Sequence, residues 1–266
     1  MDLQLIQQLI IGASLAALLS AMGAFVILRR LSWFSDGMAH VSLGGIAIAA
    51  FTSFAPLPVA LVWTTAAALI IYFLERKTKL PTDAIIGILF TASLALGILI
   101  FEKLGTDHEA IEEALFGGLT TITGGDVIAV LILSALILIW LFSFRRELTL
   151  LGLSEELASV SGISVQKQTA ALYVALAITT VLGAKVLGVV LVSALLIVPA
   201  STSRLITRSF KTYTIAAVII SEIVMLAGVY VASVSALSPG PVTVLIGAGV
   251  FILVTIAQAA RVVRTR

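Results

Sequence analysis

Residues 5–28 read LIQQLIIGASLAALLSAMGAFVIL, an apolar run without a charged residue that ends at Arg29 and Arg30. A membrane-spanning helix needs about 20 mainly apolar residues, so this run is long enough to cross a bilayer. It lacks the basic beginning of a cleavable signal peptide, and we expect it to remain in the protein. The run therefore predicts the first span of an integral membrane protein.

The composition extends this prediction to the whole chain. Of its 266 residues, 60% are hydrophobic and only 11% are Asp, Glu, Lys or Arg, too few to cover a soluble surface. The net charge of +2 gives no reason to expect a nucleic-acid partner, and the chain has no cysteine for disulfides or thiolate chemistry. We expect an all-α, polytopic helical bundle that forms one transmembrane domain over residues 1–266, surrounded by membrane lipid.

Nine apolar segments, of which the seventh is short, account for most of the chain. They lie at 4–28, 33–54, 57–75, 83–101, 126–144, 168–184, 188–199, 212–234 and 241–260. If all nine cross, the basic clusters between them share one side, which the positive-inside rule assigns to the cytoplasm. Fusing 168–199 into one crossing would break this pattern. We therefore expect about nine spans, eight at the least, with the N-terminus outside and the C-terminus inside.

One predicted inner segment, residues 151–165, has the pattern of a short capped helix. Ser154 can cap its N-terminus, Glu155 and Glu156 fall in the positively polarised first turn, and Gly162 can end it. A solvated connector is the alternative. A second inner segment, 201–211, carries three basic residues and follows Pro199, which predicts a helix break at that proline.

The predicted outer segment 102–126 is acidic and contains HEAIEEALFGGL, whose amphipathic spacing predicts a helix along the surface. His108 and Glu112 lie four residues apart there and could attract cations, although a solvated helix face explains them equally well. The second histidine of the H-E-x-x-H metalloprotease motif is missing, which excludes that chemistry.

Asp36 and His40 form the strongest candidate site. Residues i and i+4 share one face of a helix, so the carboxylate and the imidazole can converge on one cation. Oxygen with nitrogen suits a divalent metal such as zinc, manganese or iron, and ionisable groups within a membrane mark ion pathways. The neighbouring small residues would admit another helix or a narrow passage. Alternatively, Asp36 reaches water or pairs with Arg30 while His40 bonds a neighbouring helix.

Glu222 is a weaker pathway candidate. It lies in IISEIVMLAG, near the middle of a span, where a carboxylate is costly unless it has a partner or a function. A hydrogen bond to an adjacent helix is the simpler explanation.

Five stretches carry a resemblance that covers nearly the whole chain. They are LSWFSDGMAHVSLGGIAIA at 31–49, LERKTKLPTDAIIGILF at 74–90, ALFGGLTTITGGD at 114–126, KVLGVVLVSALLIVPASTSR at 185–204 and SPGPVTVLIGAGVFIL at 238–253. In order and spacing they resemble the membrane permease subunits of bacterial and archaeal ATP-binding-cassette importers for zinc, manganese or iron, the zinc permeases above all.

The resemblance implies the vitamin B12-importer-like, type II permease architecture in the cytoplasmic (inner) membrane. It implies a homodimer, two cytoplasmic ATP-binding subunits, an external metal-binding protein and no permanently bound cofactor. Asp36 and His40 fall on the family's Asp-x-x-x-His pair of the translocation pathway, and 151–165 falls on the segment that couples to the ATPase. Zinc permeases carry a further histidine where this chain reads LFTASLALG, which leaves manganese and iron open beside zinc.

The residues support an energy source on another chain. No G-x-x-x-x-G-K-[ST] phosphate loop occurs, so this subunit cannot hydrolyse ATP by that chemistry and is not expected to be an enzyme. A secondary, ion-coupled metal transporter is the alternative, but it would usually show more buried charge or paired broken helices. A membrane enzyme is disfavoured because one Asp–His pair is the single convincing constellation.

Overall fold

The computed structural model describes residues 3–105, 124–235 and 237–264, with side chains from residue 10 to 261 apart from Asp126 and the gaps. The described helices are α1 (Leu3–Arg29), α2 (Ser32–Thr52), α3 (Pro56–Lys77), α4 (Thr82–Leu104), α6 (Gly124–Ser143), α7 (Arg145–Leu153), α8 (Glu155–Val160), α9 (Val165–Leu187), α10 (Val189–Ile206), α11 (Phe210–Ser235) and α12 (Pro239–Arg264). Each of the nine predicted segments coincides with one of the longer helices, and the all-α prediction is confirmed.

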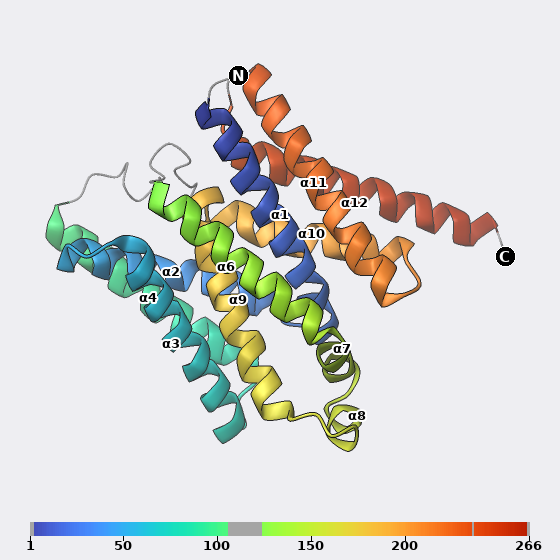
Figure 1. Ribbon diagram of the computed structural model, residues 1–266, viewed down its shortest axis with the longest axis horizontal. Helices are drawn as coiled ribbons and strands as arrows, with labels where there is room; N and C mark the ends of the chain where they lie inside the picture. Colours follow the sequence, from blue (N-terminus) through green and yellow to red (C-terminus); the bar gives the residue numbers. More distant parts are fainter. Residues whose placement is uncertain (1–2, 106–123, 236, 265–266) are drawn as a thin grey trace.

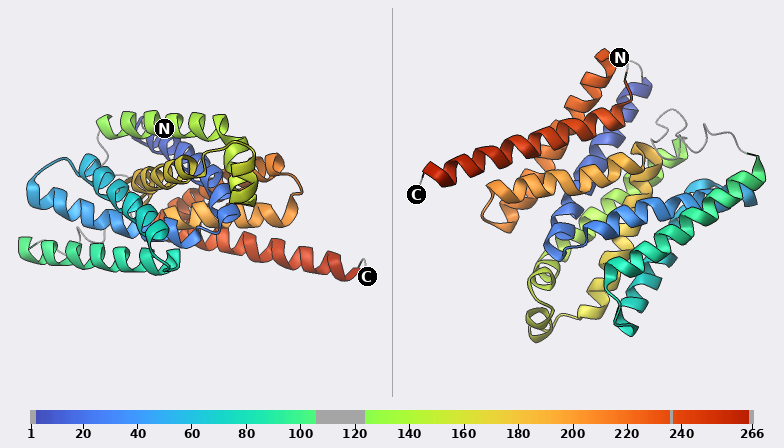
Figure 2. Two further views of the ribbon diagram at one scale, coloured as in Figure 1. Left: turned by 90° about the horizontal axis from the view of Figure 1, so that it is seen from below. Right: turned by 180° about the vertical axis from the view of Figure 1, so that it is seen from behind.

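The helices form two lateral groups joined by a central pair (Figures 1 and 2). One group contains α2, α3 and α4, and the other contains α10, α11 and α12. Between them, α1 packs on α10 and α11, while α9 packs on α3 and α2. The most apolar stretches of α1 and α9 are both 72% buried, against 28% for α4 and 17% for α12. The outer helices α4 and α12 therefore present broad apolar faces to lipid or to a partner.

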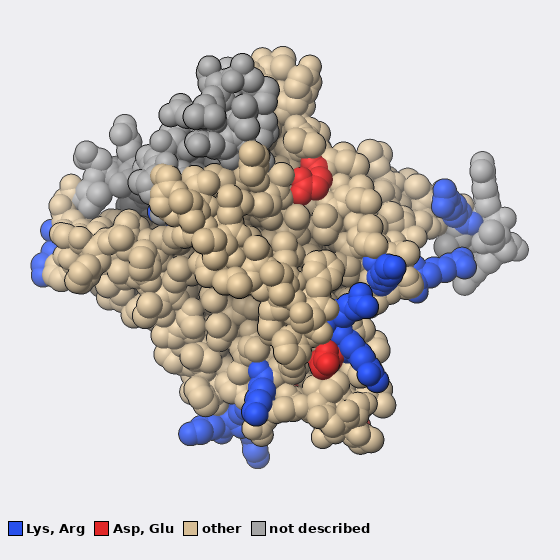
Figure 3. Space-filling model, in the orientation of Figure 1, with Lys and Arg blue, Asp and Glu red and all other residues tan. Residues whose placement is uncertain are grey.

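The number of spans agrees with the prediction of eight to nine. Eight helices are long and apolar enough to cross a membrane, and α6 with α7 gives a ninth, bent by 66° at its break. The break between α9 and α10 falls at Gly188, whose positive φ of 83° suits glycine, and each of these two helices is long and apolar enough to cross by itself. The Lys and Arg side chains visible in Figure 3 gather mainly on the lower and right-hand margins, where Figure 1 places the ends of α3 and α12 and helix α7. The sidedness itself stays a prediction.

The predicted helix break at Pro199 is wrong. Helix α10 continues through Pro199 to Ile206, and the chain turns only at 207–209. Proline is tolerated in membrane helices because neighbouring helices and hydroxyl side chains compensate for the lost hydrogen bond. Here the backbone of α10 at Leu196 lies directly against Gly23 of α1, so the helix is held in close packing beside the proline. Tertiary packing thus overrides the local preference of proline.

Candidate metal pathway at Asp36 and His40

Helix α2 fixes Asp36 and His40 on one face and sets the tautomer of the imidazole. The Nδ1 atom of His40 lies 3.0 Å from the backbone carbonyl oxygen of Asp36. A carbonyl oxygen can only accept, so Nδ1 is the protonated nitrogen and Nε2 keeps its lone pair. A metal-binding histidine usually donates its other ring N–H in this way, which orients the ring. His40 is half-buried and meets the Phe90 ring edge to face, with the ring centroids 5.0 Å apart.

The Asp36 carboxylate is held by a second helix. The Ser193 hydroxyl of α10 donates to Asp36 Oδ1 at 2.8 Å, across 157 positions of sequence. Among the described residues, Asp36 makes no ion pair with Arg30, and the hydrogen bond of His40 stays within its own helix. The alternative of an Asp36–Arg30 pair with a cross-helix histidine is therefore not what the structure shows.

Asp36 faces a cavity of about 360 Å³ between α2 and α4. The wall also includes Asp83, an exposed carboxylate in the first turn of α4, together with Gly37 and Phe90. Asp83 was not predicted as a site residue from the sequence, because an acidic residue in the first turn of a helix needs no function to explain it. The one feature of the sequence that could have pointed to Asp83 is its position at the start of a predicted span, directly after Pro81. The cavity thus brings two carboxylates from two helices to one opening.

Small residues on α2 serve close helix packing. A side chain at Gly44 would collide with Ser93 of α4, one at Gly45 with Ala60 of α3, and one at Gly37 with Ile86. The Ser93 hydroxyl donates to the Val41 carbonyl at 2.9 Å and accepts from Trp63 Nε1 at 2.9 Å. The expected close approach of another helix is confirmed, and it locks the helix that carries the candidate ligands.

Segment 151–165 contains the predicted capped helix. The Ser154 hydroxyl accepts from the Leu157 N–H at 3.2 Å and caps α8, whose first turn holds Glu155 and Glu156. Gly162, with φ 78°, follows the helix, and its N–H donates to the Ser159 carbonyl at 3.0 Å. The Ile163 N–H donates to the Ala158 carbonyl at 3.0 Å, completing a Schellman motif.

Arg29, at the end of α1, ties this segment to the bundle. One guanidinium nitrogen donates to the Leu151 carbonyl at 3.1 Å, and the other lies 3.1 Å from Glu155 Oε1. Arg29 is 11% exposed and Glu155 58%. Glu155 is therefore paired, whereas Glu156 has no ion pair within the described part of the chain.

The structure does not bring the weaker candidates to the site. Glu222 is half-buried on α11, which packs on α1, α10 and α12, whereas α2 packs mainly on α3 and α4, less on α9 and α10, and only slightly on α1. The predicted hydrogen bond from Glu222 to an adjacent helix is absent among the described side chains. His108 and Glu112 lie outside the described residues. No three His, Cys, Asp or Glu side chains in the described ranges are grouped closely enough to hold a metal ion.

Eight helices, or nine with the bent pair, are long and apolar enough to cross a membrane, which is the architecture of a multi-pass membrane protein. Residues 2–258 match the family model of the ABC 3 transport family, and the chain belongs to this family. It is therefore the membrane subunit of an ATP-binding-cassette importer, a multi-pass protein and not the ATPase.

Known relatives cover nearly the same length. The high-affinity zinc uptake system membrane protein ZnuB of Haemophilus influenzae is 29% identical over 92% of this chain and 94% of its own. The manganese transport system membrane protein MntC of Halalkalibacterium halodurans is 28% identical over 93% of this chain and 85% of its own.

Two solved structures have a similar fold. PsaBC from Streptococcus pneumoniae, in complex with Fab, matches with a TM-score of 0.84 and 26% identity over 95% of this chain and 91% of that one. A metal-chelate type ABC transporter in an inward-facing conformation matches with a TM-score of 0.76 over 95% of this chain and 85% of that one. At 19% identity the second likeness concerns the fold alone.

Proposed function

We propose that this permease carries a divalent transition-metal ion across the cytoplasmic membrane, with zinc as the first candidate and manganese or iron as the others. The observation that carries the proposal is the pair on α2, in which the Nδ1 donor bond leaves His40 Nε2 free to ligate one helical turn from the Asp36 carboxylate. A nitrogen and an oxygen ligand together suit these metals. The curated relatives are named for zinc and manganese, so the choice of metal belongs to the experiment.

Two ligands from one chain make a weak site, which suits an ion in transit. A closed four-ligand site would hold zinc as a structural ion, whereas a pathway must release it. A second copy of the chain would supply a second carboxylate and a second imidazole. The proposed assembly is therefore a homodimer whose protomers offer their pairs to one ion at a time. The exposed rim of the cavity, where Trp33 is 67% exposed, leaves room for that approach.

In this proposal, ATP hydrolysis acts on the permease through segment 151–165, which lies on the predicted cytoplasmic side. Because the chain belongs to an ATP-binding-cassette family, it works with ATPase and binding-protein partners. In the proposed complex, two cytoplasmic ATPase subunits contact α8, and an external protein delivers the metal to the opposite side. The exposed Glu156 and the Ser154 cap would present α8 as a rigid docking helix.

The decisive experiment is metal uptake by the complex reconstituted in proteoliposomes with its ATPase, with zinc, manganese and iron in competition. Asp36→Asn and His40→Ala should each abolish or strongly reduce uptake. The double variant should be hardly worse than either single variant, because members of one site are not additive. Glu222→Gln is the matched control, since it neutralises another carboxylate of a membrane helix away from the cavity, and it should transport normally.

Normal uptake by Asp36→Asn would refute the proposed pathway. Uptake that proceeds without ATP would instead support the ion-coupled carrier, which family membership disfavours.

A further inference from the structure

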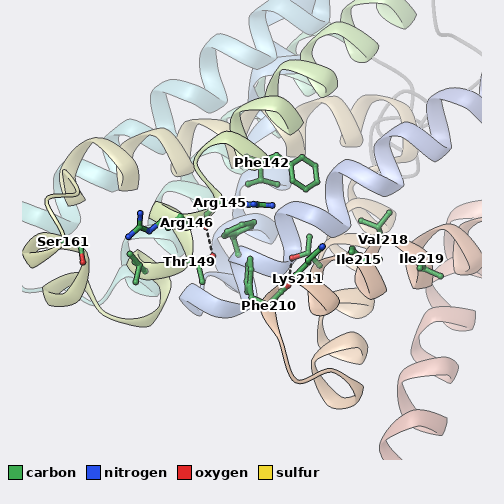
Figure 4. Close-up of a pocket in the computed structure, with 14 residues that line it drawn as sticks. Phe142, Arg145, Arg146, Thr149, Ser161, Phe210, Lys211, Ile215, Val218 and Ile219 are labelled. Atoms are coloured by element: carbon green, nitrogen blue, oxygen red, sulfur yellow. Dashed lines mark hydrogen bonds between the residues drawn. The ribbon is translucent and has the colours of Figure 1, made fainter.

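A groove of about 830 Å³ lies between the end of α6, α7 and the beginning of α11, and it shares no lining residue with the cavity at Asp36 (Figure 4). Much of its wall is apolar. Phe142 of α6 and Ile215 and Ile219 of α11 line it and are 55%, 51% and 53% exposed. These side chains belong to two spans, so the apolar part of the groove lies at membrane depth.

The other end of the groove is basic. Arg145 and Arg146 begin α7, Lys211 lies in the first turn of α11, and all three line the groove and are exposed. Figure 4 shows them on the side of α7 and the start of α11, whereas Ile215, Val218 and Ile219 follow α11 away from them. No carboxylate of the described side chains forms an ion pair with any of the three. Their positive charge is therefore available to a ligand.

We propose that this groove binds one anionic phospholipid of the inner leaflet. Its phosphate would lie among Arg145, Arg146 and Lys211, with Ser161 as a further hydroxyl donor, and an acyl chain would follow Phe142, Ile215 and Ile219. Basic pockets between membrane helices on the cytoplasmic side are typical sites for anionic headgroups. The positive-inside assignment puts this cluster at the inner boundary, where such lipids are found.

Three other occupants fit the groove less well. A soluble phosphate would use the basic end but not the apolar wall. An ATPase approaching from the cytoplasm could not cover Ile219, more than two helical turns into the span that begins at Phe210. A second copy of the chain that docked through the same face would bring its own two arginines and lysine against these three, and the like charges would repel one another. The combination of charge and apolar length selects the lipid.

The test uses the purified full-length chain after delipidation, titrated in native mass spectrometry with phosphatidylglycerol or with phosphatidylcholine of the same acyl chains. Phosphatidylglycerol should bind more tightly. A basic residue near a membrane contributes about a fivefold preference for anionic lipid, so Arg145→Gln, Arg146→Gln and Lys211→Gln together should weaken binding on the order of 100-fold. Each single variant should weaken it about fivefold, which keeps the test decisive if the triple variant fails to fold.

The matched control removes three charges from another cluster on the same predicted side, with Arg76→Gln, Lys77→Gln and Lys79→Gln. It should bind phosphatidylglycerol normally. Equal binding of the two lipids, or equal weakening in the control, would overturn the proposal.

A second measurement identifies the source of the phosphate. Phosphatidylglycerol with a photoreactive diazirine on its acyl chain should label the α6 and α11 walls of the groove, and inorganic phosphate at millimolar concentration should not displace it. Displacement by phosphate, or labelling confined to other helices, would refute the lipid site. A disulfide between two copies carrying Ile219→Cys would show that a second protomer covers the groove, which would also refute it.

Discussion

At the residue scale, hydrogen bonds hold both candidate ligands in place: Ser193 of α10 donates to the Asp36 carboxylate, and His40 Nδ1 bonds the Asp36 carbonyl of its own helix. The four-residue spacing of the two side chains places them on one helix face, as the sequence predicted. Ser193 could not be foreseen, because it is distant in the sequence and a serine in a membrane helix commonly bonds its own backbone. The relative positions of Asp36 and His40 could thus be predicted from the sequence, whereas the partner of the carboxylate depended on how α10 packs against α2.

Replacing Ser193 should change how tightly the ion is held without destroying the pathway. Ser193→Ala removes the donor to Asp36 Oδ1, so the carboxylate loses its fixed orientation. A hydrogen bond to a charged group contributes about 1.5–3 kcal/mol, and we expect the KM for the metal to rise roughly tenfold with a smaller change in kcat. Initial uptake rates over a range of metal concentrations measure this. Ser193→Thr keeps the hydroxyl and should restore the KM; an unaltered KM in Ser193→Ala would show that the bond is incidental.

Asp83 offers a second test at this scale. Because its carboxylate lines the same cavity as Asp36, neutralising it in Asp83→Asn should slow the passage of a cation while leaving the fold intact. The expected result is uptake reduced several-fold, less than in Asp36→Asn, at unchanged protein abundance. Asp83→Glu keeps the charge and should retain most of the activity. Full activity in Asp83→Asn would show that the ion passes the residues of α2 without help from Asp83.

At the element scale, periodicity and capping predicted the helices well, and the errors came from contacts between helices. The short helix α8 was predictable because Ser154 and Gly162 act through local hydrogen bonds. The course of α10 through Pro199 was not, because it depends on α1 packing against the backbone at Leu196. The ion pair of Glu155 with Arg29 was missed for the same reason.

Coupling can therefore be tested without breaking that ion pair. Glu156→Lys changes an exposed side chain of α8 and should lower ATP-driven uptake strongly, because it reverses charge on the proposed ATPase contact. The folded amount should stay the same, since no described residue pairs with Glu156. Uptake and ATP hydrolysis measured together would reveal uncoupling. Wild-type uptake in this variant would mean that α8 is a connector and not a docking helix.

The packing of α2 on α4 gives a stability prediction. In Gly44→Ala the new methyl group would collide with Ser93, and overpacking of this kind typically costs about 1–3 kcal/mol. The variant should unfold at a lower temperature in detergent. Gly249→Ala is the control, because nothing lies within 4 Å of its added methyl group and alanine favours the helix. Equal melting temperatures for the two variants would contradict the close packing of α2 against α4.

At the scale of the whole molecule, hydropathy and basic clusters predicted the class of protein and the number of spans. They could not predict the grouping of α2, α3 and α4 opposite α10, α11 and α12, because nearly every helix face is apolar and the partners are selected by close packing and a few interhelical hydrogen bonds.

Because the chain has no cysteine, single introduced cysteines report sidedness directly. Ser53→Cys, in the turn after α2, should react with an impermeant reagent in intact cells. Leu157→Cys, on α8, should react only after the membrane is opened. Labelling of Leu157→Cys from outside would overturn the assigned topology.

Arg29 connects α1 to α7 through the Leu151 carbonyl and to α8 through Glu155. Helix α1 in turn lies against Leu196 of α10, less than one helical turn from Ser193. Helix α1 therefore connects the segment that we propose meets the ATPase with the helix whose hydroxyl restrains Asp36. If α10 moved about 1 Å away from Asp36, the 2.8 Å bond would exceed hydrogen-bonding range. In the proposed cycle, freeing the carboxylate would require a movement smaller than the width of an atom.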